Sequence, residues 1–295
     1  MLSAVVFFGL LFGQILTVVV LFFRSGADVE SVISLVTNIM DYPEYLREMQ
    51  FISQLCVFIF PSLLLAYLFS DNYKEYLRTD SALNGSTVFW TILSMILVLP
   101  ALNFTTCLNQ EMALPEFLKP LEDLMRSMEE QNAKATESML YAKNTIDFIF
   151  NILIVAVFAA IGEEFLFRGV LQTVFGKSIR NRHIVIWSVA ILFSAIHFQF
   201  FGFVPRMLLG VYFGYLLYYT QNIWIPIMAH FTNNFITVVL YRIYQDNPQA
   251  MENVDSIGYG STWWLTVVSL VLFIFACSRI RKTKIVETEI PYANN

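Results

Sequence analysis

Hydrophobic residues recur along the chain in long runs that short polar connections separate. A helix needs about 20 mostly apolar residues to cross the roughly 30 Å hydrocarbon core of a bilayer. Eight runs meet this requirement approximately: 2–23, 51–70, 86–107, 146–174, 184–201, 204–220, 223–244 and 262–279. The pattern therefore predicts an all-α, polytopic membrane protein with about eight transmembrane helices. Since no long polar block separates the runs, we expect residues 1–295 to form a single integral membrane domain.

The longest connection, about 108–145, is rich in Glu and carries apolar residues at helical spacing. These residues are Leu118, Leu121, Leu124, Met125 and Met128. A charged segment with one apolar face is typical of a helix that lies in the membrane interface or caps a bundle. We therefore expect an amphipathic extracytoplasmic connection over 108–145.

The first run and the basic residues predict an orientation. The run lacks a basic n-region and exceeds an ordinary signal-peptide core, so a retained helix is expected, with cleavage near Ser25-Gly26-Ala27 as the alternative. With eight spans, the basic residues of three connections fall on one side: Lys74, Arg78, Lys177, Arg180, Arg182, Arg279, Arg281, Lys282 and Lys284. The positive-inside rule makes this side the cytoplasm. The prediction is a multi-pass protein of the cell membrane with both termini in the cytoplasm.

Composition strengthens the membrane interpretation and removes other classes. The chain is 57% hydrophobic and 14% charged, whereas soluble domains are about 45–50% apolar and roughly a quarter charged. Lys and Arg form no basic stripe, which excludes nucleic acid as a partner. Cys56, Cys107 and Cys277 show no CxxC spacing, so we interpret them as packing residues.

Two acids and an arginine interrupt the fourth apolar run, at Glu163, Glu164 and Arg168. One charge at the centre of a membrane helix is unfavourable by about 2.5 to 3.5 kcal/mol on insertion scales, so unpaired charges here would be costly. Glu164 and Arg168 are four residues apart and can pair along one helix face, while Glu163 is rotated by about 100°. We predict that Glu164 is structural and that Glu163 is free to act. The alternative is that Arg168 snorkels to the interface and both acids lie among headgroups.

Histidines enter two further runs, as Phe193-xxx-His197 and His230-xxx-Asn234. Four-residue spacing places His230 and Asn234 on one helix face. We expect the side chains of Glu163, His197 and His230 to converge in one polar cavity. Counting residues from the membrane surface places His197 more than a turn deeper than Glu163, so tilt, a kink near Gly162 or a shifted helix end must bring them level.

Together and in this order, Glu163-Glu164-xxx-Arg168, Phe193-xxx-His197 and His230-xxx-Asn234 resemble the motifs of the CAAX-protease and bacteriocin-processing (CPBP, or Abi) family of intramembrane proteases, which includes the Rce1 prenyl-protein endopeptidases. The resemblance covers about 146–245 and marks that region as a catalytic core. It implies an intramembrane endopeptidase of CAAX-processing or bacteriocin-maturation and immunity type. Its partners would be membrane lipid and a peptide or protein substrate that is lipidated or membrane-associated.

Peptide hydrolysis needs a water, a base and donors to the oxyanion. Glu163, helped by His197, would activate the water, and His230 and Asn234 would donate to the oxyanion. Glu164, Arg168 and Phe193 would support the site. No cofactor is needed in this interpretation.

A zinc-dependent version of the same peptidase is the first alternative, with Glu163, His197 and His230 as ligands. Asn234 favours the metal-free version, because a neutral amide is a poor zinc ligand and a good oxyanion donor. The HExxH, GxGD and GxSG motifs of other intramembrane proteases are absent from the sequence.

Two alternatives from other functional classes stay open. A non-hydrolytic scaffold or bacteriocin-immunity protein would keep the site without using it. A proton-coupled transporter also places Glu and His inside a membrane, although no half-to-half similarity supports it.

Overall fold

The computed structural model describes residues 2–280, and the regular elements in that range are all helical. Inside a bilayer no water is available to the backbone, so a chain this apolar must satisfy its N–H and C=O groups within helices. The prediction of an all-α polytopic membrane protein is confirmed.

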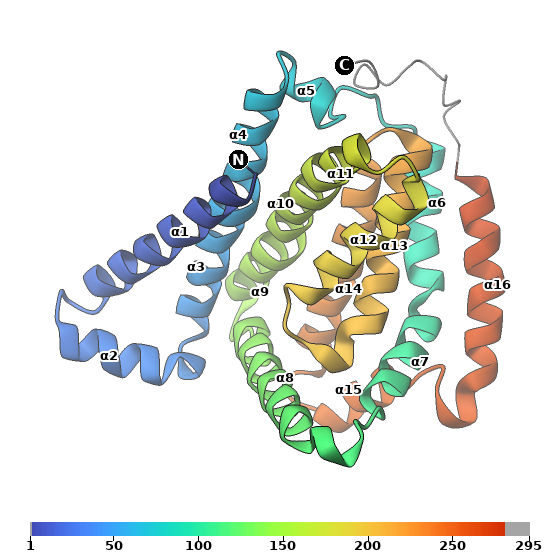
Figure 1. Cartoon of the computed structure of the whole chain (residues 1–295). Coiled ribbons are helices and arrows are strands. Elements are labelled where there is room, and N and C mark those ends of the chain that lie inside the picture. Colours follow the sequence, from blue (N-terminus) through green and yellow to red (C-terminus); the bar gives the residue numbers. More distant parts are fainter. Residues whose placement is uncertain (1, 281–295) are drawn as a thin grey trace.

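Sixteen α-helices lie within the described range (Figure 1). The N-terminal third contains α1 (Leu2–Arg24), α2 (Val29–Thr37), α3 (Pro43–Ser53), α4 (Phe60–Phe69), α5 (Tyr73–Tyr76), α6 (Gly85–Leu97) and α7 (Leu99–Gln110). The middle contains α8 (Lys119–Leu140), α9 (Thr145–Asn151), α10 (Ala159–Glu164), α11 (Gln172–Ser178) and α12 (Arg182–Ala195). The last part contains α13 (Phe203–Thr220), α14 (Trp224–Tyr244), α15 (Pro248–Asp255) and α16 (Trp263–Arg279).

The long helices run alternately up and down between two ends of a bundle (Figure 1). The α5 helix, the end of α11 and the start of α12 lie at one end, where α16 also finishes, while α2, α8 and α15 lie at the other. Lys74, Lys177, Arg182 and Arg279 belong to the first group of elements. These four residues therefore lie at one end of the bundle, as the charge pattern predicts, whereas Arg281, Lys282 and Lys284 lie outside the described residues.

Among the described residues, five helical stretches have the length and apolarity of a membrane span, and a sixth consists of α6 and α7 joined at a 41° bend. Pro100 near the start of α7 accounts for the bend, because its ring blocks a regular helical hydrogen bond. The α12 helix has only 14 residues, about 21 Å, and ends at Ala195 instead of near 201. The α14 helix carries His230, Asn233 and Asn234. All eight predicted runs coincide with helices, but their number as membrane spans stays a prediction.

Three π-helical segments interrupt the long helices, at Gln54–Ile59, Ile152–Phe158 and Phe165–Leu171. A π turn widens the helix by one residue and is frequent at functional sites. The last two segments flank α10, so the departures from regular helix lie on both sides of Gly162 and not at the glycine itself. They set the direction in which the α10 side chains point.

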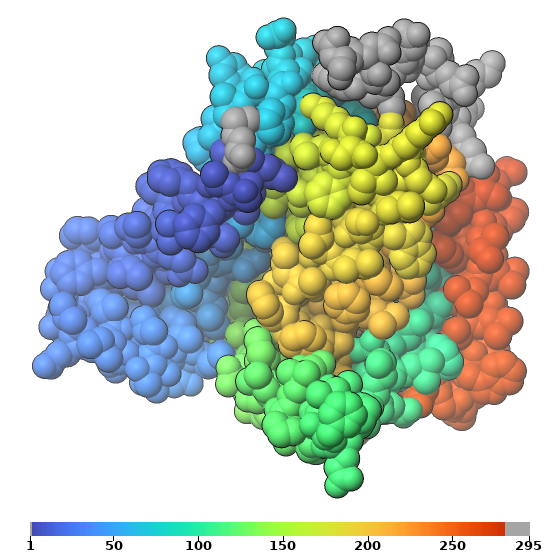
Figure 2. All heavy atoms as spheres, viewed as in Figure 1, coloured from blue at the N-terminus to red at the C-terminus, as the bar shows by residue number. Residues whose placement is uncertain are grey.

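The N-terminal lobe, α1 to α3, projects from one side of the bundle (Figures 1 and 2). Two glycines let α1 pack closely against the π segment Gln54–Ile59. A Cβ at Gly9 would lie 2.3 Å from the Cys56 carbonyl oxygen, and one at Gly13 would lie 3.2 Å from the Cys56 Cβ. Since the backbone oxygen cannot yield, only glycine fits at position 9.

Glycines also bring α13 against α12. A Cβ on Gly210 would lie 3.1 Å from the Ala190 Cβ, and one on Gly214 would lie 2.8 Å from Ile186 Cγ2. The pair spaced four apart therefore allows the close helix approach for which such spacing is known. This packing matters for the site, because it also exposes the Gly210 carbonyl to α10 and its neighbours.

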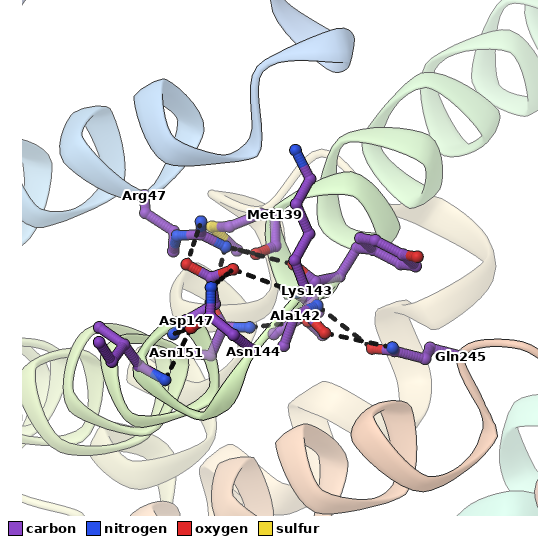
Figure 3. A network of polar contacts seen from close by, with 11 residues as sticks. Arg47, Met139, Ala142, Lys143, Asn144, Asp147, Asn151 and Gln245 are labelled. Carbon is purple, nitrogen blue, oxygen red and sulfur yellow. Dashed lines mark hydrogen bonds and ion pairs between the residues drawn. The ribbon is translucent and has the colours of Figure 1, made fainter.

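A polar network fixes the start of α9 (Figure 3). The guanidinium of Arg47, on α3, donates to the carbonyl oxygens of Met139 at 3.1 Å and Tyr141 at 3.3 Å, and lies 3.4 Å from Asp147 Oδ1. The Asn151 amide donates to the Leu140 carbonyl at 2.7 Å. The network therefore anchors the base of the α9–α11 helix to α3 and to the end of α8.

Candidate functional site

Glu163 and Glu164 close α10, immediately before the second of the two flanking π segments. Both side chains are buried, with exposed fractions of 7% and 0%. Buried ionisable groups are stable only when they are paired or hydrogen-bonded. Each acid meets this condition with a different set of partners.

Glu164 pairs with Arg168, one helical turn later on the same face. Arg168 Nη1 donates to Glu164 Oε1 at 2.9 Å, and Nη2 donates to the Gly210 carbonyl oxygen at 2.8 Å. The guanidinium carbon lies 4.7 Å from the Phe193 ring centroid and 5.4 Å from that of Phe213. The charge is thus held inside the protein by one carboxylate, one carbonyl and two aromatic faces. Arg168 is fully buried inside the protein, which argues against a guanidinium that reaches out to the headgroups.

His230, on α14, lies between the two acids. Its Nδ1 is 2.8 Å from Glu164 Oε1, and its Nε2 is 3.8 Å from Glu163 Oε2. The imidazole stacks on Phe213 at 5.1 Å and meets the Phe193 ring edge-on at 5.8 Å. Both ring nitrogens therefore have a fixed orientation, one toward each carboxylate.

Glu163 has a second contact that lies far away in the sequence. The amide Nε2 of Gln54 donates to Glu163 Oε1 at 3.2 Å. The two oxygens of Glu163 thus face different groups, Oε1 toward Gln54 and Oε2 toward His230.

His197 lies just beyond the end of α12 and is half-buried. Its Nδ1 is 2.8 Å from the Phe193 carbonyl oxygen, and its ring contacts the Phe193 ring at 5.3 Å. It is close enough to Glu163 and His230 to interact with both electrostatically. His197 belongs to the turn that follows α12, two residues after the helix ends at Ala195.

Asn234 contacts the π segment that precedes α10 and its two acids. Its Nδ2 donates to the Val155 carbonyl oxygen at 2.9 Å, inside the π segment Ile152–Phe158. A second contact joins Asn233 Nδ2 to Asn234 Oδ1 at 3.2 Å. An amide group has two N–H donors, so one of them stays available after the Val155 contact.

The structure therefore brings Glu163, Glu164, Arg168, Phe193 and His230 into direct contact, with His197 attached through Phe193. A single cavity shared by Glu163, His197 and His230 stays a prediction. A cavity of about 400 Å³ lies elsewhere and contains none of these residues. It lies near α3 and α8 and is lined by Met40, Asp41, Pro43, Lys134, Glu137, Ser138, Tyr141 and Lys143.

The sequence motifs do not predict two contacts of the site. Gln54 carries no motif, and its only signal is an amide inside an apolar run. The Gly210 carbonyl has no signal beyond the packing pair Gly210 and Gly214. The contact between Glu164 and His230 is also new, because the sequence assigns Glu164 to Arg168 alone.

The donor set can be compared with the needs of a metal. Within residues 2–280, the His, Cys, Asp and Glu side chains form no group of three or more that could hold a metal ion. Glu163 and His230 face each other, but the third proposed ligand, His197, does not complete a group with them.

The comparison with known families agrees with the motifs. Residues 145–236 match the family described as "Type II CAAX prenyl endopeptidase Rce1-like". This range runs from the first residue of α9 to just past Asn234 and contains the seven predicted site residues. The resemblance predicted from the sequence is confirmed over this segment.

One curated relative is the "Uncharacterized protein YpbD" of Bacillus subtilis (strain 168). It is 31% identical over 96 residues, which are 31% of this chain and 44% of the relative. The match thus spans less than half of the relative's length. No solved structure matches the chain.

Proposed function

We propose that this protein is an intramembrane endopeptidase in which Glu163 activates a water molecule for attack on a peptide bond. The observation that carries the proposal is the facing pair of Glu163 Oε2 and His230 Nε2, 3.8 Å apart and buried among helices. A base and a donor that face each other across this distance can act on opposite ends of one reacting water and carbonyl.

The proposed reaction gives each of the two adjacent acids a positively charged partner. Arg168 supplies the first through Glu164. An imidazolium at His230, donating from Nδ1 to Glu164, supplies the second, and its Nε2–H then points toward Glu163 and the reacting carbonyl.

The reaction follows from these positions. The Glu163 carboxylate removes a proton from water while the water oxygen bonds to the carbonyl carbon. The carbonyl oxygen becomes an oxyanion that accepts from His230 Nε2–H. Protonated Glu163 then delivers its proton to the peptide nitrogen, the oxyanion collapses to a carbonyl as the C–N bond breaks, and a carboxylic acid and an amine leave with Glu163 again ionised.

His197 and Asn234 take supporting parts in this proposal. His197 Nδ1 is held at the Phe193 carbonyl, which leaves Nε2 to contact the water or the substrate. Asn234 donates one N–H to Val155 and offers the other to the oxyanion. Each group is thus held by a main-chain oxygen and keeps one nitrogen or N–H for the reaction.

We propose a metal-free mechanism, because Glu163, His197 and His230 are not arranged as a ligand set. The substrate would be a peptide or protein that is lipidated or otherwise associated with the membrane, as in CAAX processing or bacteriocin maturation. The end of the bundle that carries Lys74, Lys177 and Arg279 would face the cytoplasm.

The test uses the full chain in liposomes with a peptide library that includes prenylated peptides. Wild type, Glu163→Gln and His230→Gln are compared, with Glu130→Gln as the control because Glu130 is an exposed acid on α8. We expect cleavage by wild type and Glu130→Gln, unchanged by a chelator, and a loss of at least a hundredfold in the two site variants. Cleavage that a chelator abolishes and zinc restores would establish the metal-dependent alternative.

The remaining alternatives give different outcomes in the same experiment. A transporter would move protons or solute across the liposome without cleaving any peptide. A scaffold or immunity protein would do neither and would keep its binding partner after Glu163→Gln. Either result would reject the peptidase.

A further inference from the structure

Gln54 occupies an unusual place for an amide. It begins the π segment Gln54–Ile59, in the middle of the helical stretch Pro43–Phe69, and only 1% of its surface is exposed. An amide buried in such an apolar setting costs free energy unless its polar atoms have partners. The partner of its donor atom is Glu163, which lies 109 positions away in the sequence.

The Gln54 contact gives the two oxygens of the Glu163 carboxylate different partners. Nε2 of Gln54 donates to Oε1 at 3.2 Å, whereas Oε2 faces His230. A donor on one oxygen fixes the rotation of the carboxylate, because the hydrogen bond keeps its geometry in only one orientation. Oε2 is then the oxygen that points toward the reacting groups.

The acceptor atom of the same amide is also buried beside this carboxylate. Within the described part of the chain, Gln54 Oε1 has no hydrogen-bond partner. Buried acceptors are satisfied in the great majority of native structures. An acceptor next to a general base is suited to the second hydrogen of the water whose first hydrogen goes to Glu163.

Close packing shows that Gln54 is held in position by its surroundings. A Cβ on Gly162 would lie 2.9 Å from Gln54 Oε1 and 3.0 Å from the Phe58 Cβ. The absence of a side chain at 162 is therefore what lets the Gln54 amide reach α10. On the other side, Cys56 of the same π segment packs against Gly9 and Gly13 of α1.

We infer that Gln54 is a positioning residue of the active centre: its N–H orients the Glu163 carboxylate, and its carbonyl oxygen orients the attacking water. This inference rests on the proposed peptidase function and adds to it a residue from outside the segment 145–236. It also gives the N-terminal lobe a part in the reaction, since Gln54 directly follows α3.

The kinetic test compares Gln54→Met with Cys56→Ala. Methionine keeps the shape of glutamine and removes both hydrogen-bonding atoms, while Cys56→Ala alters the same buried π segment without touching Glu163. For Gln54→Met we expect kcat to fall roughly tenfold to a hundredfold with little change in KM.

Gln54→Glu tests the donor in a second way and serves if the methionine variant fails to fold. A protonated Glu at 54 can donate to Glu163, and an ionised one repels it. This variant should keep activity only toward the acid side of the wild-type profile. Wild-type kcat and pH profiles in both variants would overturn the inference.

An infrared measurement separates this inference from the peptidase proposal. The carboxylate band of Glu163 is assigned in membranes as the band lost in Glu163→Gln. We expect it to shift in Gln54→Met and not in Cys56→Ala, whether or not any peptide is cleaved. An unshifted band would overturn the contact itself, whereas a shifted band with no cleavage by wild type would reject only the peptidase function.

Discussion

His230 Nδ1 lies 2.8 Å from Glu164 Oε1, and the same oxygen accepts from Arg168 Nη1 at 2.9 Å. A carboxylate on Nδ1 fixes both the rotation of the imidazole and the direction of its other nitrogen. Two acids that are neighbours in the sequence thus serve opposite nitrogens of one ring. The rotation of about 100° between successive helical residues makes this division possible.

Glu164→Gln should lower activity through His230. The amide keeps the size of the carboxylate but loses its charge, so the imidazole of His230 is held less firmly. We expect kcat to fall roughly tenfold to a hundredfold. The measurement is peptide cleavage per folded molecule, with folding followed by gel filtration in detergent. Unaltered kcat would show that the contact does not orient His230 for the reaction.

Arg168→Met should destabilise the protein by about 3 to 5 kcal/mol, because it leaves the buried pair Glu163 and Glu164 with one positive partner fewer. The double variant Glu164→Gln with Arg168→Met should regain part of that loss, since neither charge is then unpaired. Reversible unfolding of the four proteins in mixed micelles measures this coupling. Strictly additive losses would argue against a direct ion pair.

Gly162→Ala should be destabilising by about 1 to 3 kcal/mol, the usual range for overpacking. Its new methyl group would meet the Gln54 amide and the Phe58 Cβ. Gly85→Ala is the matched control, because a Cβ on Gly85, the first residue of α6, meets nothing within 4 Å. Thermal unfolding in detergent should separate the two variants. An equal effect in both variants would mean that the side chains around Gly162 can move to accommodate a methyl group.

Glu122 should make the connection between α7 and α8 sensitive to acid. The hydrogen bond from Arg126 Nε, then that from the Leu114 N–H, lowers the pKa of Glu122 below its ordinary value of 4.5, with Lys119 adding to the effect. Because the folded pKa is the lower one, this stabilisation is complete above the ordinary pKa. It is lost as the pH falls through the folded value.

Amide exchange over 111–126, corrected for intrinsic rates, tests this expectation. Wild type should be better protected than Glu122→Gln at neutral pH, and the difference should vanish in strong acid. Protection that stays different under strongly acidic conditions would contradict the assignment to Glu122.

The sequence predicts those parts of the site that lie on one helix. The pair of Glu164 and Arg168 follows from helical geometry alone. Outside the site, the apolar spacing in the connection 108–145 predicts a helix, and α8 occupies Lys119–Leu140 there. The contact between Gln54 and Glu163 could not be predicted, because it depends on how two distant helices pack. The division of the two acids between the nitrogens of His230 depends on the same packing.

Hydropathy also fails at the end of α12. The apolar run continues to 201, yet the helix stops at Ala195. Ser194 Oγ donates to the Phe203 carbonyl at 2.7 Å, and Phe198 adopts a left-handed backbone with φ of 51°. These features turn the chain toward α13. A hydropathy pattern cannot predict them, because they are a side-chain hydrogen bond and a backbone angle.

Arg168 has a main-chain oxygen as its second partner, and this affects how the site can vary among relatives. Any residue at position 210 would supply the same carbonyl, so the chemistry of the contact places no demand on that residue. Its size does, because Ala190 and Phe193 lie within 3.2 Å of where a side chain would begin. In related sequences, the size of the residue at 210 should therefore vary together with the sizes of the residues at 190 and 193. A search for charged or polar partners of Arg168 would overlook position 210.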